Sequence, residues 1–67
     1  MDAPKPEPGD WIRFYRDGAL AIGIVQYVRT AASWSDGKWR CETDRGPADD
    51  DEILELRRRD GATWIRK

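Results

Sequence analysis

Asp-Gly pairs stand at three places in this chain of 67 residues and constrain its fold more than any other feature. They are Asp17-Gly18, Asp36-Gly37 and Asp60-Gly61. Glycine adopts positive φ without steric penalty, so Asp-Gly between apolar stretches is typical of tight β-hairpin turns. A further turn is expected at 44–47, where Gly46-Pro47 interrupts the pattern. Four turns predict five strands and an all-β domain.

Side chains of the expected strands alternate between two faces. These strands span 10–16, 19–30, 38–44, 52–58 and 62–66. In the first hairpin, a three-residue loop places Phe14 opposite Leu20 on the core side. Ile12 then faces Ile22. We prefer this loop to a two-residue loop, which would set Arg13 beside Ile22.

Gly23 interrupts the longest expected strand and predicts a bulge or a bend there. Strongly bent strands allow very small sheets to close into barrels. At the C-terminus, a two-residue turn at Asp60-Gly61 pairs Leu56 with Ile65 on the inner face. The sequence therefore predicts a five-stranded barrel whose interior is shared by Ile12, Phe14, Leu20, Ile22, Leu56 and Ile65.

Residues 49–60 have a second interpretation as a short helix. Asp49 suits an N-cap, Glu52 stands at the capping-box position, and Gly61 suits the residue after the helix. The segment has few apolar residues, however, and they do not share one helical stripe. We therefore favour a strand, or a single turn followed by a strand.

Composition narrows the classes of function. With 12 Lys and Arg against 13 Asp and Glu, the net charge of −1 gives no overall attraction to nucleic acid or anionic membrane. The chain has no His and a single Cys, Cys41, which excludes imidazole catalysis, Cys/His zinc sites and an intrachain disulfide. The acidic run 49–52 lacks EF-hand spacing. No enzymatic activity, metal or cofactor is expected.

Residues 1–8 are expected to form a flexible, disordered Pro-rich arm, and residues 9–67 the barrel domain. Pro4, Pro6 and Pro8 lack the amide hydrogens that a ladder or a helix requires. The N-terminal stretch has no apolar segment of the signal-peptide kind, and the longest apolar run, 19–25, is too short to cross a membrane. Together with the lone cysteine, these features predict a cytoplasmic protein without membrane contact.

Three short stretches follow one another in a familiar order: Gly9-Asp10-Trp11-Ile12, Arg16-Asp17-Gly18 and Ile22-Gly23-Ile24-Val25. This order resembles the first hairpin of Tudor-type domains, which are SH3-like barrels, and residues 39–56 are similar to the second half of that pattern. The resemblance covers residues 9–58 and implies an SH3-like barrel. Tudor domains commonly bind methylated Lys or Arg in an aromatic cage. By position, the cage walls fall on Tyr15, Ala21, Cys41 and Gly46 or Pro47, of which only the first is aromatic.

Aromatic and basic side chains provide the candidate binding residues. Trp34 lies in the polar stretch 31–37, where its ring either meets a partner or folds back over the barrel end. On the expected strands, other rings fall on outer faces together with arginines. They form a surface for a peptide or for stacked bases, or they cover glycines and arginine stems. The candidate binding residues are Trp11, Arg13, Tyr15, Trp34, Arg57 and Trp64.

These features predict a non-enzymatic binding or assembly module. The expected partner is a protein or peptide, which includes a second copy of this chain in a homodimer. A nucleic-acid-binding module is the alternative, because the C-terminal hairpin is basic through Arg57, Arg58, Arg59, Arg66 and Lys67. The isoelectric point of about 5.3 favours a protein partner.

Overall fold

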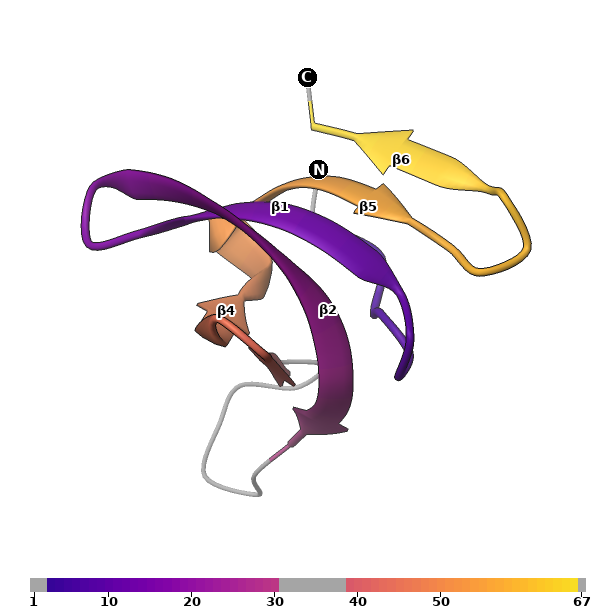
Figure 1. Cartoon of the computed structure of the whole chain (residues 1–67), viewed down its shortest axis with the longest axis horizontal. Helices are drawn as coiled ribbons and strands as arrows, with labels where there is room; N and C mark the ends of the chain where they lie inside the picture. The colour runs from indigo at the N-terminus through magenta and orange to yellow at the C-terminus, as the bar shows by residue number, and fades with distance from the viewer. Residues whose placement is uncertain (1–2, 31–38, 67) are drawn as a thin grey trace.

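The computed structural model describes residues 3–30 and 39–66 as one antiparallel sheet (Figure 1). The strands lie side by side in the order β4-β3-β2-β1-β5-β6. Their bounds are β1 Trp11–Arg16, β2 Ala19–Arg29, β3 Arg40–Thr43, β4 Gly46–Asp49, β5 Ile53–Arg57 and β6 Thr63–Ile65, with a 3-10 turn, η1, at Asp50–Glu52. The all-β prediction is confirmed. In the described part of the chain, no helix is long and apolar enough to span a membrane.

The expected five-stranded closed barrel differs from this arrangement in two respects. The sheet is open, with β4 and β6 as its end strands, and it has six strands. The additional strand is β4, which forms because the turn at 44–45 returns the chain directly onto β3, so that Thr43 pairs with Gly46. Gly46 has a φ of +117°, which favours glycine at the start of this strand.

The long strand β2 joins the two halves of the sheet. It pairs with β1 through Ala19–Ile24 and with β3 from Val25 onward. Figure 1 shows how strongly β2 curves along its length. The register shifts between Val25 and Tyr27, so the bulge lies after Gly23. Gly23 itself packs against β3, where a Cβ would lie 2.6 Å from Thr43 Oγ1. Close approach of the two strands is therefore what requires glycine here.

The first hairpin has a two-residue turn, and the three-residue prediction is wrong. Arg16 pairs directly with Ala19, and both turn residues have positive φ, 52° at Asp17 and 79° at Gly18. Such a turn matches the right-handed twist of the strands. The change of register by one residue turns Leu20 and Ile22, two predicted core residues, to the exposed side.

The C-terminal hairpin has a longer loop than the predicted two-residue turn. Arg57 pairs with Thr63, and Arg58 N donates to Ala62 O at 2.7 Å across the loop. The strand pairs are therefore Leu56 with Trp64 and Glu55 with Ile65. Ile65 is exposed, which corrects its assignment to the core.

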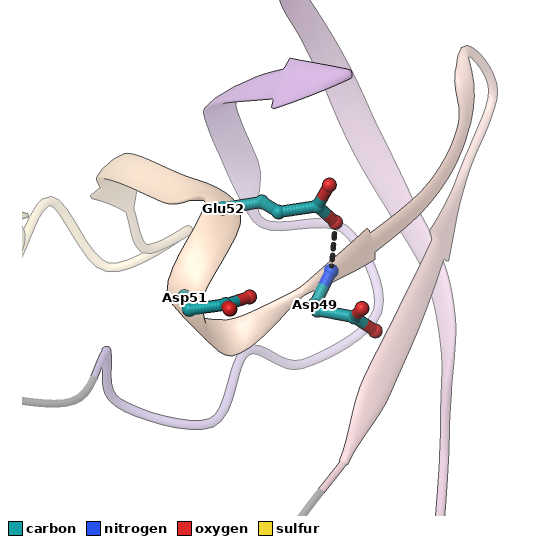
Figure 2. Close-up of side chains that lie close together, drawn as sticks. All are labelled: Asp49, Asp51 and Glu52. Carbon is teal, nitrogen blue, oxygen red and sulfur yellow. Dashed lines mark hydrogen bonds between the residues drawn. The ribbon is translucent and has the colours of Figure 1, made fainter. Parts of the chain in front are cut away.

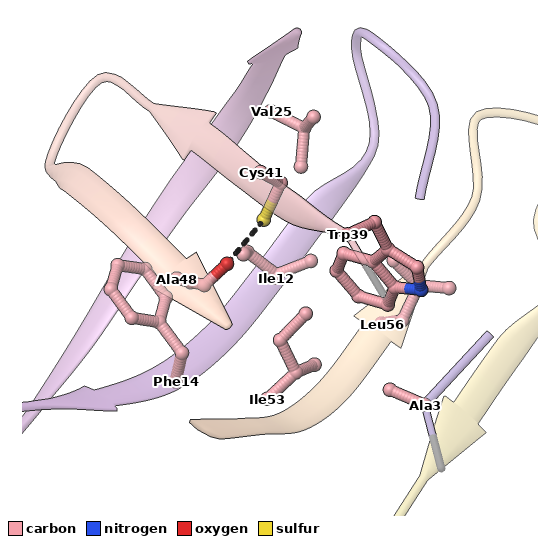
Figure 3. Packing of buried hydrophobic residues seen from close by; sticks show 9 residues of the cluster. All are labelled: Ala3, Ile12, Phe14, Val25, Trp39, Cys41, Ala48, Ile53 and Leu56. Atoms are coloured by element: carbon pink, nitrogen blue, oxygen red, sulfur yellow. Dashed lines mark hydrogen bonds between the residues drawn. The ribbon is translucent and has the colours of Figure 1, made fainter. Parts of the chain in front are cut away.

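The core lies on the inner side of the curved sheet (Figure 3). Three of the six predicted core residues, Ile12, Phe14 and Leu56, are fully or almost fully buried. The rest of the interior comes from both halves of the sheet and from the chain before β1. The buried apolar cluster consists of Ala3, Ile12, Phe14, Val25, Trp39, Cys41, Ala48, Ile53 and Leu56.

The N-terminal segment lies against the domain, whereas the proline spacing predicted a flexible arm. Ala3 belongs to the core cluster, and Pro6 is fully buried. Asp10, also buried, accepts hydrogen bonds from Glu7 N at 2.8 Å and from Arg58 Nη1 at 2.9 Å. The N-terminal segment is therefore held by the burial of Ala3 and Pro6 and by the hydrogen bonds of Asp10. These contacts do not require the amide hydrogens that prolines lack.

The segment 49–60 forms a single turn followed by a strand, and the helical alternative is wrong. η1 contains only three residues, Asp50–Glu52, and β5 begins at Ile53. The capping-box contact is nevertheless present, because Asp49 N donates to Glu52 Oε1 at 2.8 Å. β5 then pairs with β1 and places Leu56 in the core.

Candidate functional site

The convex side of β1, β5, β6 and the first part of β2 carries large exposed apolar side chains. We call this surface the outer face; by register it consists of Trp11, Arg13, Tyr15, Leu20, Ile22, Ile24, Glu55, Arg57, Thr63 and Ile65. Its aliphatic residues and Tyr15 are between 43% and 57% exposed. Exposed apolar side chains that gather on one side of a small sheet make this face the candidate interaction site.

Strand pairing arranges the outer face in rows. One row crosses four strands from Ile65 through Glu55 and Arg13 to Ile22. In a neighbouring row, Arg57 lies next to Trp11, with its Cζ 4.7 Å from the ring centroid. Aliphatic side chains thus stand on both sides of an aromatic and charged centre.

The charges at this centre neutralise one another. Glu55 is almost buried and lies between two arginines, with Oε1 3.3 Å from Arg13 Nε and Oε2 2.8 Å from Arg57 Nε. Arg13 Nε is itself buried and, among the described groups, has no hydrogen-bond partner of good geometry. Glu55 therefore neutralises both arginines. Their side chains remain exposed, 37% for Arg13 and 59% for Arg57, so the face presents these paired cations to solvent beside its aliphatic groups.

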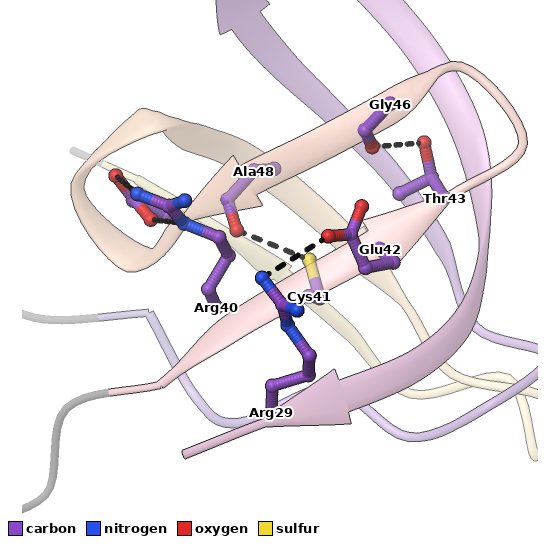
Figure 4. Close-up of polar contacts among 8 residues, drawn as sticks. Arg29, Arg40, Cys41, Glu42, Thr43, Gly46 and Ala48 are labelled. Atoms are coloured by element: carbon purple, nitrogen blue, oxygen red, sulfur yellow. Dashed lines mark hydrogen bonds and ion pairs between the residues drawn. The ribbon is translucent and has the colours of Figure 1, made fainter. Parts of the chain in front are cut away.

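The outer surface of the other half of the sheet is mostly polar (Figure 4), although Tyr27, which pairs with Glu42, is 48% exposed. Glu42 Oε1 lies 3.5 Å from Arg29 Nη2, and Arg40 Nε donates to Asp49 Oδ1 at 2.7 Å. This hydrogen bond raises the pKa of Arg40 above its usual value. Paired charges of this kind are typical of a solvated surface.

Three carboxylates gather at η1 (Figure 2). Oxygens of Asp49, Asp51 and Glu52 lie within 4.8 Å of one another. Two of the three groups already have structural roles, because Asp49 pairs with Arg40 and Glu52 accepts the Asp49 amide. The cluster is explained by capping of the turn and by the ion pair.

Cys41 lies in the core beneath β4. Its Sγ donates to Ala48 O at 3.4 Å, and the residue is fully buried. Burial raises the pKa of the thiol to about 11, because the thiolate would lose its hydration. A protonated, enclosed thiol is a poor nucleophile.

The candidate binding residues divide into three groups. Trp11, Arg13, Tyr15 and Arg57 lie together on the outer face. Trp64 does not, since it pairs with Leu56 and packs against the core, with Arg66 Cζ 5.2 Å from its ring centroid. Trp34 lies outside the described residues.

Sequence reasoning missed the aliphatic part of the outer face. The sequence predicted Leu20, Ile22 and Ile65 inside the core, whereas the structure exposes all three. The preference of Asp-Gly for two-residue turns was the available signal for the first two residues. A direct turn at Asp17-Gly18 places Ile22 beside Arg13, which is the observed pair.

The positions that match the Tudor cage do not form one site. Tyr15 is exposed on the outer face, whereas Cys41 is buried in the core on the inner side. Ala21 also packs against the core. The resemblance therefore does not extend to an aromatic cage among these positions.

Comparisons with known proteins add no relative to this description. No family model, curated protein or solved structure matches the chain.

Proposed function

We propose that this chain is a non-enzymatic binding or assembly module of the SH3-like class that docks a protein partner on its outer face. The observation that carries the proposal is the exposure of Tyr15, Leu20, Ile22, Ile24 and Ile65 on one side of the sheet. Removing such apolar surface from water contributes about 25 cal/mol for each Å² buried. A partner with a complementary apolar surface gains most from this face.

The SH3-like assignment is supported by the arrangement of the strands. A long bent β2 is shared by two halves, and β1 lies between β2 and β5. A short 3-10 turn connects β4 to β5. Small, strongly bent sheets with this sharing of one strand are the basis of small β-barrels.

Three arginines of the C-terminal hairpin already have partners within the domain, which favours a protein partner over nucleic acid. Arg57 is held by Glu55 and Trp11, and Arg58 by Asp10. Arg66 donates to the carbonyl oxygens of Ile53 and Asp50. Phosphate binding requires cations that can exchange their counterions for the phosphate groups, and these three already have internal partners.

A photo-reactive amino acid placed at Ile65 tests the proposal in cells that naturally produce the protein. We expect a discrete crosslinked protein from this position. The matched control carries the same probe at Arg29, which is also exposed but lies on the polar half, and should give no such product. Crosslinks to nucleic acid, or identical products from both positions, would contradict the proposal.

A titration with single- and double-stranded oligonucleotides at low and moderate salt tests the nucleic-acid alternative directly. We expect no binding even at low salt, where phosphate contacts are strongest. Salt-dependent binding would instead support the nucleic-acid alternative.

A further inference from the structure

One edge of β2 is left without a neighbouring strand. Val25 N donates to Asp10 O at 2.8 Å, so Val25 directs its main-chain groups toward the β1 side. On the opposite edge, Ile24 N donates to Asp44 Oδ1 at 2.9 Å, and Ile24 O accepts from Asp44 N at 3.3 Å. Because these directions alternate along an antiparallel strand, Leu20 and Ile22 also point away from β1.

No strand occupies that side of β2 before Val25 in the described part of the chain. The N–H and C=O groups of Leu20 and Ile22 therefore form a short open edge. The side chains of the same two residues are 55% and 51% exposed. Main-chain pairing groups and aliphatic surface thus coincide within three residues.

The sheet protects its two end strands but not this edge. β4 contains Pro47, which has no amide hydrogen, and it ends at the charged Asp49. β6 has only three residues. Short strands, prolines and charges are the usual means of preventing edge pairing. The segment Ala19–Gly23 has no charged residue and no proline. This composition is typical of a strand that pairs with another strand.

We propose that the occupant of this edge is a second copy of the chain, paired antiparallel through β2 and centred on Ala21. This inference goes beyond the proposed function, because the second copy binds through the main-chain groups of the β2 edge and does not reach Ile65. In this register, Leu20 faces Ile22 of the second copy, and Ile22 faces Leu20 of the second copy. Both pairs are of the hydrogen-bonded type, so all of the open groups of both residues are used.

The edge is self-complementary in shape and charge. A twofold axis at Ala21 places this small side chain opposite its own copy, while the two Leu–Ile pairs lie on the outer face. The row from Ile65 through Arg13 to Ile22 then continues into Leu20 and Tyr15 of the second copy. The paired segment itself carries no charged side chain. The contact is small, so the dimer is weak and dissociates on dilution.

Charged pairs at the two facing positions test the register. We expect L20K/I22K to raise the dimer dissociation constant at least about tenfold in sedimentation equilibrium, because each Lys faces a Lys. The control variant L20K/I22E has the same number of charged side chains, but in this register each Lys faces a Glu. It should therefore restore dimerisation. A twofold axis at residue 20 or 22 would set like charges opposite each other and give no rescue.

Amide hydrogen exchange in the unmodified protein gives a measurement that does not depend on any variant folding. Exchange at Leu20 and Ile22 should slow as protein concentration rises. Ala21, whose amide points to β1, should be protected at every concentration. Concentration-independent exchange at all three positions would overturn the inference, as would a dimer that L20K/I22K leaves unchanged.

The Ile65 probe separates this inference from the proposed function. Ile65 lies on β6, away from the β2 edge, and Ile65→Lys should leave the dimer intact. A monomeric protein that still crosslinks another protein from Ile65 would overturn the dimer alone. A dimer with no crosslink from Ile65 would overturn docking on the outer face and support the β2 pairing.

Discussion

The two halves of this sheet cover the same core but treat their outer surfaces differently. On the β2-β3-β4 half, arginines pair with Glu42 and Asp49 in contact with solvent. On the β1-β5-β6 half, the charges of Arg13, Glu55 and Arg57 are drawn together, and aliphatic side chains stand around them. A chain with 37% charged residues has enough of them to cover both halves. The large exposed aliphatic side chains of the described residues gather on the β1-β5-β6 half and the adjoining part of β2, and the proposed docking of a partner rests on this difference.

Truncation of the same residue type on the two sides of the sheet gives the largest effect. Ile12 is fully buried and Ile22 is about half exposed, although they lie on adjacent strands. We expect Ile12→Ala to lower the free energy of unfolding by about 2–5 kcal/mol, because it leaves a cavity. Ile22→Ala should cost less than about 1 kcal/mol. Urea denaturation measures both, and similar losses would show that the outer face is part of the folded core.

The dependence of stability on alkaline pH tests the burial of Cys41 in the core under the polar half. The folded pKa of Cys41 is about 11 against an ordinary value of 9.0, so the folded state holds the thiol proton more strongly than the unfolded state. The stabilisation is complete below pH 9 and is lost as pH rises toward 11. At about 1.4 kcal/mol for each unit, the loss is roughly 2–3 kcal/mol. Cys41→Ala should remove this dependence while lowering stability at neutral pH, and an unchanged slope would contradict the assignment.

A side chain at Gly23, where the two halves of the sheet meet, should destabilise the protein. A Cβ there would lie 2.6 Å from Thr43 Oγ1 and 2.9 Å from Thr43 Cβ. We expect Gly23→Ala to destabilise the protein by about 1–3 kcal/mol, because β2 and β3 must separate. The same change in a Thr43→Gly background should cost less, since the opposing side chain is gone. Thermal unfolding of the double-mutant cycle measures the coupling, and additive losses would place the strain elsewhere.

The sequence predicted where three turns lie, at 17–18, 44–47 and 60–61, but not the registers of the strands that they join, for a physical reason. The turn predicted at Asp36-Gly37 lies outside the described residues. Asp17-Gly18 is a local signal, because two residues alone determine the positive φ values of the turn. The register depends on whether a loop has two or three residues, and one residue reverses every side chain of the following strand. Counting buried aliphatic groups favoured the wrong loop, because it assumed that Leu20 and Ile22 belong inside.

The same reason explains which candidate binding residues were placed correctly. Trp11, Arg13 and Tyr15 share β1, where alternation relative to Ile12 does not depend on any loop. Trp64 follows a loop of uncertain length, and its predicted side was wrong. The close approach of Thr43 to Gly23 joins positions 20 residues apart in sequence, so no local pattern reveals it.

Removal of a single carboxylate charge from each half gives the smallest and most specific contrast. Glu55 is almost buried, and it is the partner through which Arg13 Nε, itself buried, is compensated. We expect Glu55→Gln to lower the free energy of unfolding by about 1–2 kcal/mol, because two arginines lose their counter-charge. Glu42→Gln is the matched control on the polar half, where Arg29 is half exposed, and it should cost less than about 0.5 kcal/mol. Equal effects in urea denaturation would mean that the charges of the two halves are equally solvated. The burial of Glu55 would then not distinguish the centre of the outer face from the polar half.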